Sequence, residues 1–201
     1  MDHKNHYEQA FRAYLQSAGY CYVAVNESAR SPFGNVTLKN LDFIVYGGGG
    51  SRLLVDIKGR RFPSGSPGRQ RRVWENWCHE DDLRGLSRWC ELFGTGYCGL
   101  LVFAYHVLPE IPMFSDTEDL WYWKEKRYLF RAVTVQDYRR HMRVRSPKWK
   151  TVNLSRSAFQ EIVLPFRHFA QGPMRVGQDE EADWWDAAAC SEAAHGLTAG
   201  G

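Results

Sequence analysis

A glycine-rich reversal between two apolar runs constrains the fold most. Residues 41–46 (Leu-Asp-Phe-Ile-Val-Tyr) and residues 51–58 (Ser-Arg-Leu-Leu-Val-Asp-Ile-Lys) flank four successive glycines, Gly47 to Gly50. Runs of β-branched and aromatic residues around a glycine cluster are typical of a β-hairpin, because glycine adopts the positive φ that a tight reversal needs. The sequence therefore predicts two antiparallel strands joined at these glycines.

The register of this hairpin decides whether two acidic side chains meet. A turn centred near Gly49 places Asp42 opposite Asp56 on one face, with Cβ atoms roughly 4.5–5.5 Å apart. Two ionised carboxylates at about 5 Å repel by about 3 kcal/mol at an effective dielectric constant of 20. A divalent cation between them reverses the sign, and carboxylate oxygens suit Mg²⁺ or Mn²⁺. A shift of one residue would send the two aspartates to opposite faces.

A lysine extends this acidic pair. Lys58 follows Asp56 by two residues, so it points to the same face, about 7 Å along the strand. Two carboxylates and a lysine around one point suit metal-assisted phosphodiester hydrolysis, in which the metal ionises a water and the lysine orients it or offsets phosphorane charge. The alternative is an exposed hairpin that carries Asp, Asp and Lys without a function.

Charge divides the chain into a basic body and an acidic end. Residues 1–177 hold all 26 Lys and Arg against 17 acids, a net charge of +9, and the remainder holds six acids and no cation. At 201 residues one domain is the default. We expect an α/β domain over residues 1–170 and a disordered acidic tail over residues 171–201, which is rich in Gly and Ala. The basic body favours a polyanionic partner.

Cysteine use and hydropathy bear on the compartment. The five cysteines include no C-x-x-C pair, which disfavours a zinc site or a disulfide framework and favours a reducing cytoplasm. The N-terminus lacks the apolar region of a signal peptide. The longest apolar stretch, near residues 99–108, is shorter than the ~18 residues of a membrane span. We therefore expect a cytoplasmic protein without a membrane anchor.

The first helix offers a third acid. Apolar residues recur at helical spacing over residues 5–18, and Gly19 ends the pattern. Glu8 lies at the edge of the apolar stripe, where it could reach toward the surface on which the helix packs. It also completes a capping box with Asn5. The sequence leaves both interpretations open.

An arginine-rich segment follows the hairpin. Residues 59–73 are broken by glycine and proline, and residues 58–73 contain no acid and six cations: Lys58, Arg60, Arg61, Arg69, Arg71 and Arg72. We expect a loop whose arginines contact phosphates, with an ordinary solvated loop as the alternative. Residues 124–150 carry ten further cations interleaved with Tyr138 and Trp149, a pattern that fits a nucleic-acid surface with stacking groups.

The remaining pattern predicts a mixed α/β chain. We expect a strand at residues 20–25, a loop at 26–38, a helix in the second half of 74–93 and a strand buried on both faces at 97–107. The order strand, helix, buried strand implies a parallel crossover. Edge strands at 121–123 and 127–135, a short helix near 136–142 and a helix over 155–169 interrupted at Pro165 complete the expectation.

These elements together resemble the PD-(D/E)XK nucleases, the restriction-endonuclease-like superfamily, over roughly residues 5–108. The resemblance implies an αβββαβ core with a mixed central sheet flanked by helices, and it is greatest for the Holliday-junction-resolvase branch. It assigns catalytic positions to Glu8, Asp42, Asp56 and Lys58. It further implies Mg²⁺ or Mn²⁺ bound by Glu8, Asp42, Asp56 and the carbonyl of Ile57, with Lys58 orienting the attacking water.

A second resemblance concerns the opening residues 6–11, His-Tyr-Glu-Gln-Ala-Phe, which are similar to the signature of an uncharacterised bacterial family, HYExAFE. Arg12 departs from the final Glu of that signature, and the family implies no activity. The expected function is a Mg²⁺-dependent DNA endonuclease of a repair, recombination or defence type, with a homodimer as one arrangement. The alternatives are an inactive nucleic-acid-binding module on the same fold and an interaction protein that docks through its tail.

Overall fold

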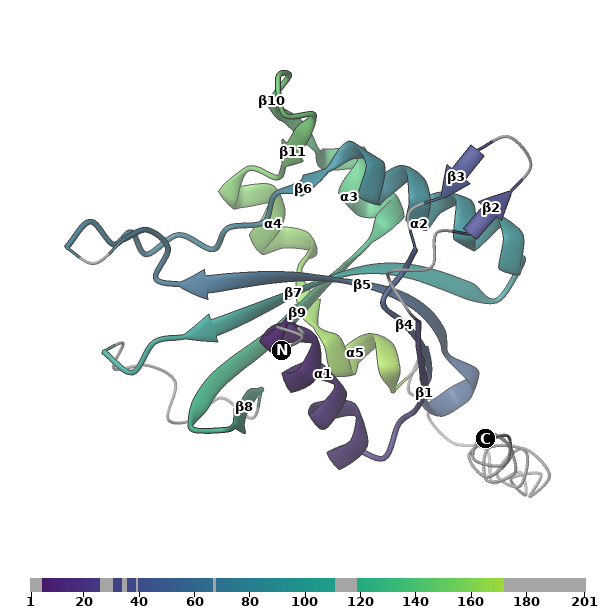
Figure 1. Cartoon of the computed structure of the whole chain (residues 1–201), viewed down its shortest axis with the longest axis horizontal. Helices are drawn as coiled ribbons and strands as arrows, with labels where there is room; N and C mark the ends of the chain where they lie inside the picture. Colours follow the sequence, from purple (N-terminus) through teal and green to yellow (C-terminus); the bar gives the residue numbers. More distant parts are fainter. Residues whose placement is uncertain are drawn as a thin grey trace.

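The computed structural model describes residues 5–25, 31–33, 36–38, 40–66, 68–110 and 119–171. Its centre is a mixed sheet in the order β1-β4-β5-β7-β9-β12, with β8 added to β9 (Figure 1). The strands are β1 (Cys21–Ala24), β4 (Phe43–Tyr46), β5 (Arg52–Phe62), β7 (Tyr97–Val107), β8 (Leu120–Trp123), β9 (Lys126–Thr134) and β12 (Leu164–Pro165). The expected acidic tail lies outside the described residues from position 172 onward.

Helices cover both faces of this sheet. The helices α1 (His6–Ser17) and α5 (Phe166–Ala170) pack on one face, and α2 (Glu80–Phe93), α3 (Val135–His141) and α4 (Arg156–Ile162) pack on the other (Figure 1). Each face has its own buried cluster, because side chains alternate along β5 and β7. Val55 and Val102 face α1, whereas Leu54 and Phe103 face α2.

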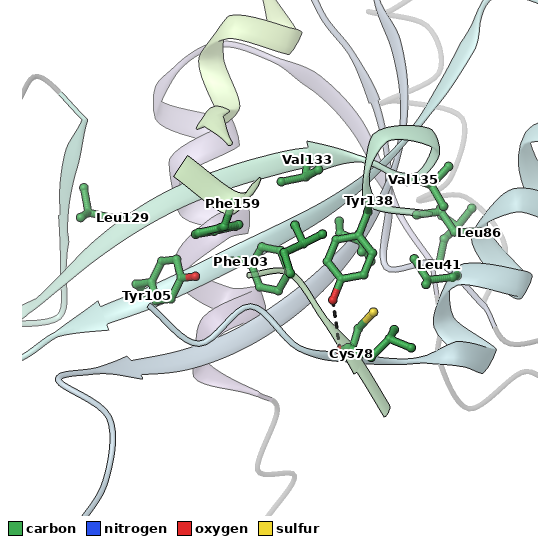
Figure 2. Close-up of a cluster of buried hydrophobic side chains, with 14 of the residues drawn as sticks. Leu41, Cys78, Leu86, Phe103, Tyr105, Leu129, Val133, Val135, Tyr138 and Phe159 are labelled. Atoms are coloured by element: carbon green, nitrogen blue, oxygen red, sulfur yellow. Dashed lines mark hydrogen bonds between the residues drawn. The ribbon is translucent and has the colours of Figure 1, made fainter. Parts of the chain in front are cut away.

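Aromatic side chains fill the α2 face. Phe103 lies near the rings of Tyr138 and Phe159, with ring centroids 6.3 and 5.6 Å away (Figure 2). Rings at these separations interact favourably beyond their buried area. This cluster fixes α3 and α4 against the middle of the sheet.

The order of elements confirms the predicted fold class. Reading α1, β1, β4, β5, α2 and β7 gives the αβββαβ core, in which β1, β4 and β5 are antiparallel neighbours. The β5 and β7 strands pair in parallel over eleven residues, joined by the segment that contains α2. The strand predicted at residues 97–107 is correct to the residue, because its apolar run is buried on both faces.

Three local predictions were wrong. The expected loop at 26–38 contains a small hairpin, β2 (Ser31–Phe33) with β3 (Val36–Leu38), whose Ser-Pro and Gly-Asn pairs masked its strands. The β5 strand continues to Phe62, because β7 supplies a partner along its whole length. The β9 strand is not an edge strand, since β12 pairs with its outer side.

A smaller sheet lies beside α2. It joins β10 (Arg143–Ser146), β11 (Thr151–Asn153) and β6 (Cys78–His79), and the β10–β11 hairpin projects from the body (Figure 1). The last helix pattern is interrupted at Pro165 as expected, giving α4 and α5. Across the described part of the chain, none of the helices has the length and apolar character needed to span a membrane.

Candidate active site

The hairpin register is as predicted over the paired strands. Phe43 faces Val55 and Tyr46 faces Arg52, with the two pairs between them in the same register. The reversal is a single 3₁₀ turn, Gly48–Gly50, in which Gly49 and Gly50 have φ angles of 62° and 79°. Such angles are costly for residues with a Cβ, so the glycine cluster sets the position of the turn.

At Asp42 the ladder departs from this register by one residue. The Asp42 amide donates to the carbonyl of Val55 at 2.9 Å, and its carboxylate oxygen Oδ2 accepts from the amide of Ile57 at 2.5 Å. The β4 strand begins only at Phe43, so the carboxylate takes the amide that a longer β4 would have bonded. Asp42 is therefore buried beside the Asp56–Ile57 peptide rather than simply opposed to Asp56.

Lys58 lies between two buried carboxylates. Its Nζ is 2.6 Å from Asp56 Oδ2 and 3.0 Å from Asp82 Oδ2. Asp56 and Lys58 come from alternate positions of β5 and share the face covered by α2, as the strand spacing predicted. Asp82 comes from the first turn of α2, and its side chain is almost fully buried. A crevice lined by Asn40, Leu41, Asp56, Asp82 and Leu86 borders this cluster.

These carboxylates determine the charge state of Lys58. Burial lowers the Lys58 pKa, but Asp56 and Asp82 outweigh burial by charge and by hydrogen bonding, and the net shift is upward. Lys58 is consequently an ammonium at neutral pH. It can stabilise or orient negative groups, and it cannot act there as a proton acceptor.

Asp82 is a site residue that the sequence analysis missed. It occupies the third position of α2, where its carboxylate accepts from the amide of His79 at 2.9 Å. The available signal was a cluster of three acids, Glu80 to Asp82, at the start of a helix that crosses the sheet. Acids at a helix start are ordinarily explained by capping and the helix dipole, so this signal does not by itself indicate a lysine partner.

Glu8 lies on a helix that does not pack on the sheet face that carries Lys58. Helix α1 covers the opposite face, where Tyr7 lies so close to Gly59 that a Cβ there would be 2.2 Å from the ring. Glu8 Oε1 accepts from the side-chain amide of Asn5 at 2.8 Å, and Asn5 caps the helix by accepting from Tyr7. Glu8 and Asn5 thus interact at the start of the helix as the capping box predicted, but Glu8 accepts from the side-chain amide of Asn5. The ligand role of Glu8 stays a prediction.

The five arginines differ in their environments. Arg60 is only 9% exposed, donates to the carbonyls of Gly59 and Trp77, and lies over the Trp77 ring at 4.1 Å. This geometry makes Arg60 a support for Trp77. The other four arginines are exposed, on the end of β5 and on the loop that follows it: Arg61, Arg69, Arg71 and Arg72.

The donor chemistry fits a hard divalent cation. Asp42 and Asp56 supply carboxylate oxygens, and the carbonyl of Ile57 faces the same strand edge as its amide, which Asp42 binds. Within the described ranges, no group of three or more His, Cys, Asp or Glu side chains is arranged to hold a metal ion. Mg²⁺ commonly binds through one or two carboxylates and keeps several waters, so a set of fewer than three such side chains is compatible with its chemistry.

Comparisons with known proteins find similarity in structure but not in sequence. No family model matches the chain, and no curated protein matches it in sequence. Hjc, a Holliday junction resolvase of Archaeoglobus fulgidus, is similar to this chain in structure. The similarity covers 82% of this chain and 98% of that one, at 15% identity and a TM-score of 0.46. The likeness of residues 6–11 to the HYExAFE signature stays a prediction.

Proposed function

We propose that the protein is a Mg²⁺- or Mn²⁺-dependent phosphodiester hydrolase that cleaves DNA. The observation that carries this proposal is Lys58 held between Asp56 and Asp82, directly beside the Asp42–Ile57 contact. Acids and a permanently charged lysine converge here at the end of a strand pairing, next to an arginine-rich loop. Buried charge clusters of this kind are characteristic of functional sites.

Each residue has a distinct role in this proposal. Asp42, Asp56 and the Ile57 carbonyl would hold the cation, with Glu8 as a further ligand if its carboxylate leaves Asn5. The bound cation would polarise the phosphoryl oxygen and lower the pKa of a water. Lys58, as an ammonium, would orient that water or stabilise charge on the phosphorane, and Asp82 would position Lys58. The exposed arginines, Arg61, Arg69, Arg71 and Arg72, would bind phosphates.

One observation favours a second function, an inactive nucleic-acid-binding module on the same fold. Lys58 already compensates Asp56 with a short contact, so a structural ion pair accounts for part of the geometry. That module would bind nucleic acid through the same arginines without any effect of metal. Dimer formation, suggested by the resemblance to nucleases, and a cytoplasmic location, suggested by the cysteine pattern, are further parts of the proposal.

Cleavage assays separate the two functions. The purified chain is incubated with Mg²⁺ or Mn²⁺ and with plasmid, linear duplex, four-way junction or RNA. We expect cleavage of DNA that falls by at least about 100-fold in Asp56→Asn and in Lys58→Met, because preorganised charge at a reacting centre contributes ~10²–10³-fold. The control is Glu91→Gln, an exposed acid of α2 paired with Arg88.

Metal binding provides a readout independent of turnover. Titration of Mn²⁺ by calorimetry should detect a site in the wild type that is weakened in Asp42→Asn. Absence of both cleavage and metal binding, with intact salt-dependent DNA binding, would overturn the hydrolase in favour of the binding module. Equal cleavage by wild type and Asp56→Asn would also overturn the assignment of the site.

A further inference from the structure

An open groove lies beside the small sheet, and the acidic cluster around Lys58 does not line it. Its volume is about 540 Å³, and it is lined by Trp77, His79, Arg145, Ser146, Trp149 and Thr151. Sites for small molecules and cofactors occupy roughly 300–1,000 Å³. Two indole rings, an imidazole and a guanidinium therefore surround a space within the range of ligand-binding sites.

The floor of the groove, residues 75–77, is fixed by hydrogen bonds from buried side chains. Three successive carbonyls, those of residues 75, 76 and 77, accept from buried side chains of the main sheet and α3. Tyr105 donates to Glu75 at 2.9 Å, and Tyr138 lies 2.7 Å from the Asn76 carbonyl. Arg60 donates to the Trp77 carbonyl. Trp77 is thus fixed before any ligand arrives, which lowers the ordering cost of binding.

Cationic and polar groups face this floor. The guanidinium of Arg145 lies 4.7 Å from the centroid of the Trp77 ring, in addition to Arg60 at 4.1 Å. Thr151 also lines the groove. A ligand with an aromatic face would stack on the exposed ring of Trp149, close to the positive charge of Arg145.

The outer wall is an exposed tryptophan on a basic hairpin. The Trp149 residue is 66% exposed. Its carbonyl lies 3.2 Å from Nδ1 of His79, which lines the opposite side of the groove. Residues 143–153 contain four exposed cations and no acid: Arg143, Arg145, Lys148 and Lys150. Glu80 and Asp81 lie on the α2 side, so anionic groups are favoured along the hairpin and disfavoured on the helix.

We propose that this groove binds an unpaired nucleobase of the substrate. The base would stack on Trp149, and its flanking phosphates would lie along Arg145 and Lys148. Every base has a π face, so such stacking tolerates any sequence. His79 caps the helix that carries Asp82 at its third position, which places the groove about one helical turn from the Lys58 cluster. The inference rests on the proposed hydrolase and assigns it substrates with single-stranded nucleotides.

Equilibrium binding tests the groove without turnover. A fluorescein-labelled single strand, a junction or flap with unpaired nucleotides, and a fully paired duplex are titrated by anisotropy in EDTA. Trp149→Ala should weaken binding of the first two by about 5- to 150-fold, the effect of losing one stacked base, and leave the duplex within about twofold. Tyr122→Ala is the matched control, because Tyr122 is 64% exposed on β8 and outside the groove.

A conservative variant separates stacking from a general structural effect. Trp149→Phe keeps an aromatic face and should recover most of the affinity, whereas Trp149→Leu should not. Equal single-strand binding by wild type and Trp149→Ala would overturn the groove. Loss of affinity for all three substrates together would overturn it as well, since that result indicates a general phosphate contact.

The outcome is independent of the cleavage assay. If the wild type cleaves DNA but Trp149→Ala binds and cleaves every substrate normally, the proposed hydrolase activity is supported and the proposed base-binding groove is contradicted. If the wild type never cleaves but Trp149→Ala loses affinity for single strands, the base-binding groove is supported and the protein is an inactive binding module. Each proposal can therefore fail without the other.

Discussion

Lys58 is the residue on which the proposed chemistry depends. Its raised pKa means that the ammonium form persists above the ordinary lysine range, and the stabilisation it provides is fully present below pH 10.5 and lost only when the pH rises through the folded-state pKa. Through the usual assay range the cluster keeps one positive charge between two carboxylates. A cation that binds Asp56 must therefore compete with, or displace, the ammonium at 2.6 Å.

Asp82→Asn tests the positioning of Lys58. The amide can still accept from His79, so the helix cap survives, but one charge partner of Lys58 is lost. We expect the free energy of unfolding to fall by about 1–3 kcal/mol, the cost of weakening a charged hydrogen bond. The kcat of the proposed hydrolase should fall at least tenfold with little change in KM, because a displaced Lys58 affects the reacting phosphate and not the distant contacts.

Asp81→Asn is the control for this experiment, measured by chemical denaturation and steady-state cleavage. Asp81 is the preceding residue of the same turn, is exposed, and pairs with Arg84 on the helix surface. Its removal should alter stability by less than about 1 kcal/mol. Wild-type kcat in a stable Asp82→Asn protein would contradict the positioning role.

Residues close in sequence were predictable, and those contributed by distant elements were not. Asp56 and Lys58 share a face because a strand alternates with a period of two, which the sequence specifies directly. Asp82 joins them only because α2 packs back on β5, and nothing in residues 80–82 specifies that partner. Asp42 was placed near its position, but its one-residue departure depends on where β4 begins.

The extended segment before β6 links the core to the surface. The Tyr138 hydroxyl is near the carbonyls of both Asn76 and Val152, so one side chain of α3 supports the floor of the groove and the β11 strand. Asn76 in turn accepts from the Leu154 amide at 3.0 Å. The segment that forms the floor of the groove is therefore hydrogen-bonded to the aromatic cluster of the α2 face.

Tyr138→Phe should loosen this segment. The change removes the hydroxyl that donates its single proton between the Asn76 and Val152 carbonyls, and we expect a loss of about 1–3 kcal/mol in the free energy of unfolding. Single-strand affinity should also fall, because the Asn76 carbonyl next to Trp77 loses its hydroxyl donor. Tyr122→Phe removes an exposed hydroxyl and serves as the control; equal stability and binding of wild type and Tyr138→Phe would contradict the support role.

Element types were more predictable than their roles in the sheet. Helix α1 and strand β7 follow from strong periodicity and a long apolar run. The three-stranded sheet of β6, β10 and β11 was not foreseen, since its strands have two to four residues and carry cations or lie beside turns. Such strands owe their form to neighbours that sequence periodicity does not reveal.

The molecule as a whole concentrates positive charge at one end of the sheet. His106, at the end of β7, has its pKa lowered to about 4 by burial and then by the charges of Lys126, His6, Arg61 and Arg127. His6 lies beside it, with ring centroids 5.7 Å apart, and its pKa is lowered too. Both rings are therefore neutral in the folded protein at pH values where the unfolded chain is protonated.

Acid should destabilise the protein through this pair. Between about pH 6.5 and pH 4 the unfolded chain binds more protons at His106 than the folded chain, so stability falls as the pH falls through that window. We expect Tm to decrease from pH 7 to pH 4.5, with a smaller decrease in His106→Gln. His141→Gln, on α3, is the control; an equal decrease in wild type and His106→Gln would contradict this assignment.

The parallel pairing of β5 with β7 also determines when the catalytic groups can first meet. Paired residues of these strands, such as Arg52 and Tyr97, are 45 positions apart in the sequence. The chain must therefore lose the conformational entropy of closing a long loop before the hydrogen bonds between the strands can stabilise the pairing. Asp56 and Lys58 lie on β5, and Asp82 lies on α2, in the segment that connects β5 to β7. A nascent chain that ends before β7 would thus contain Asp56, Lys58 and Asp82 without the parallel pairing that holds them together in the folded protein.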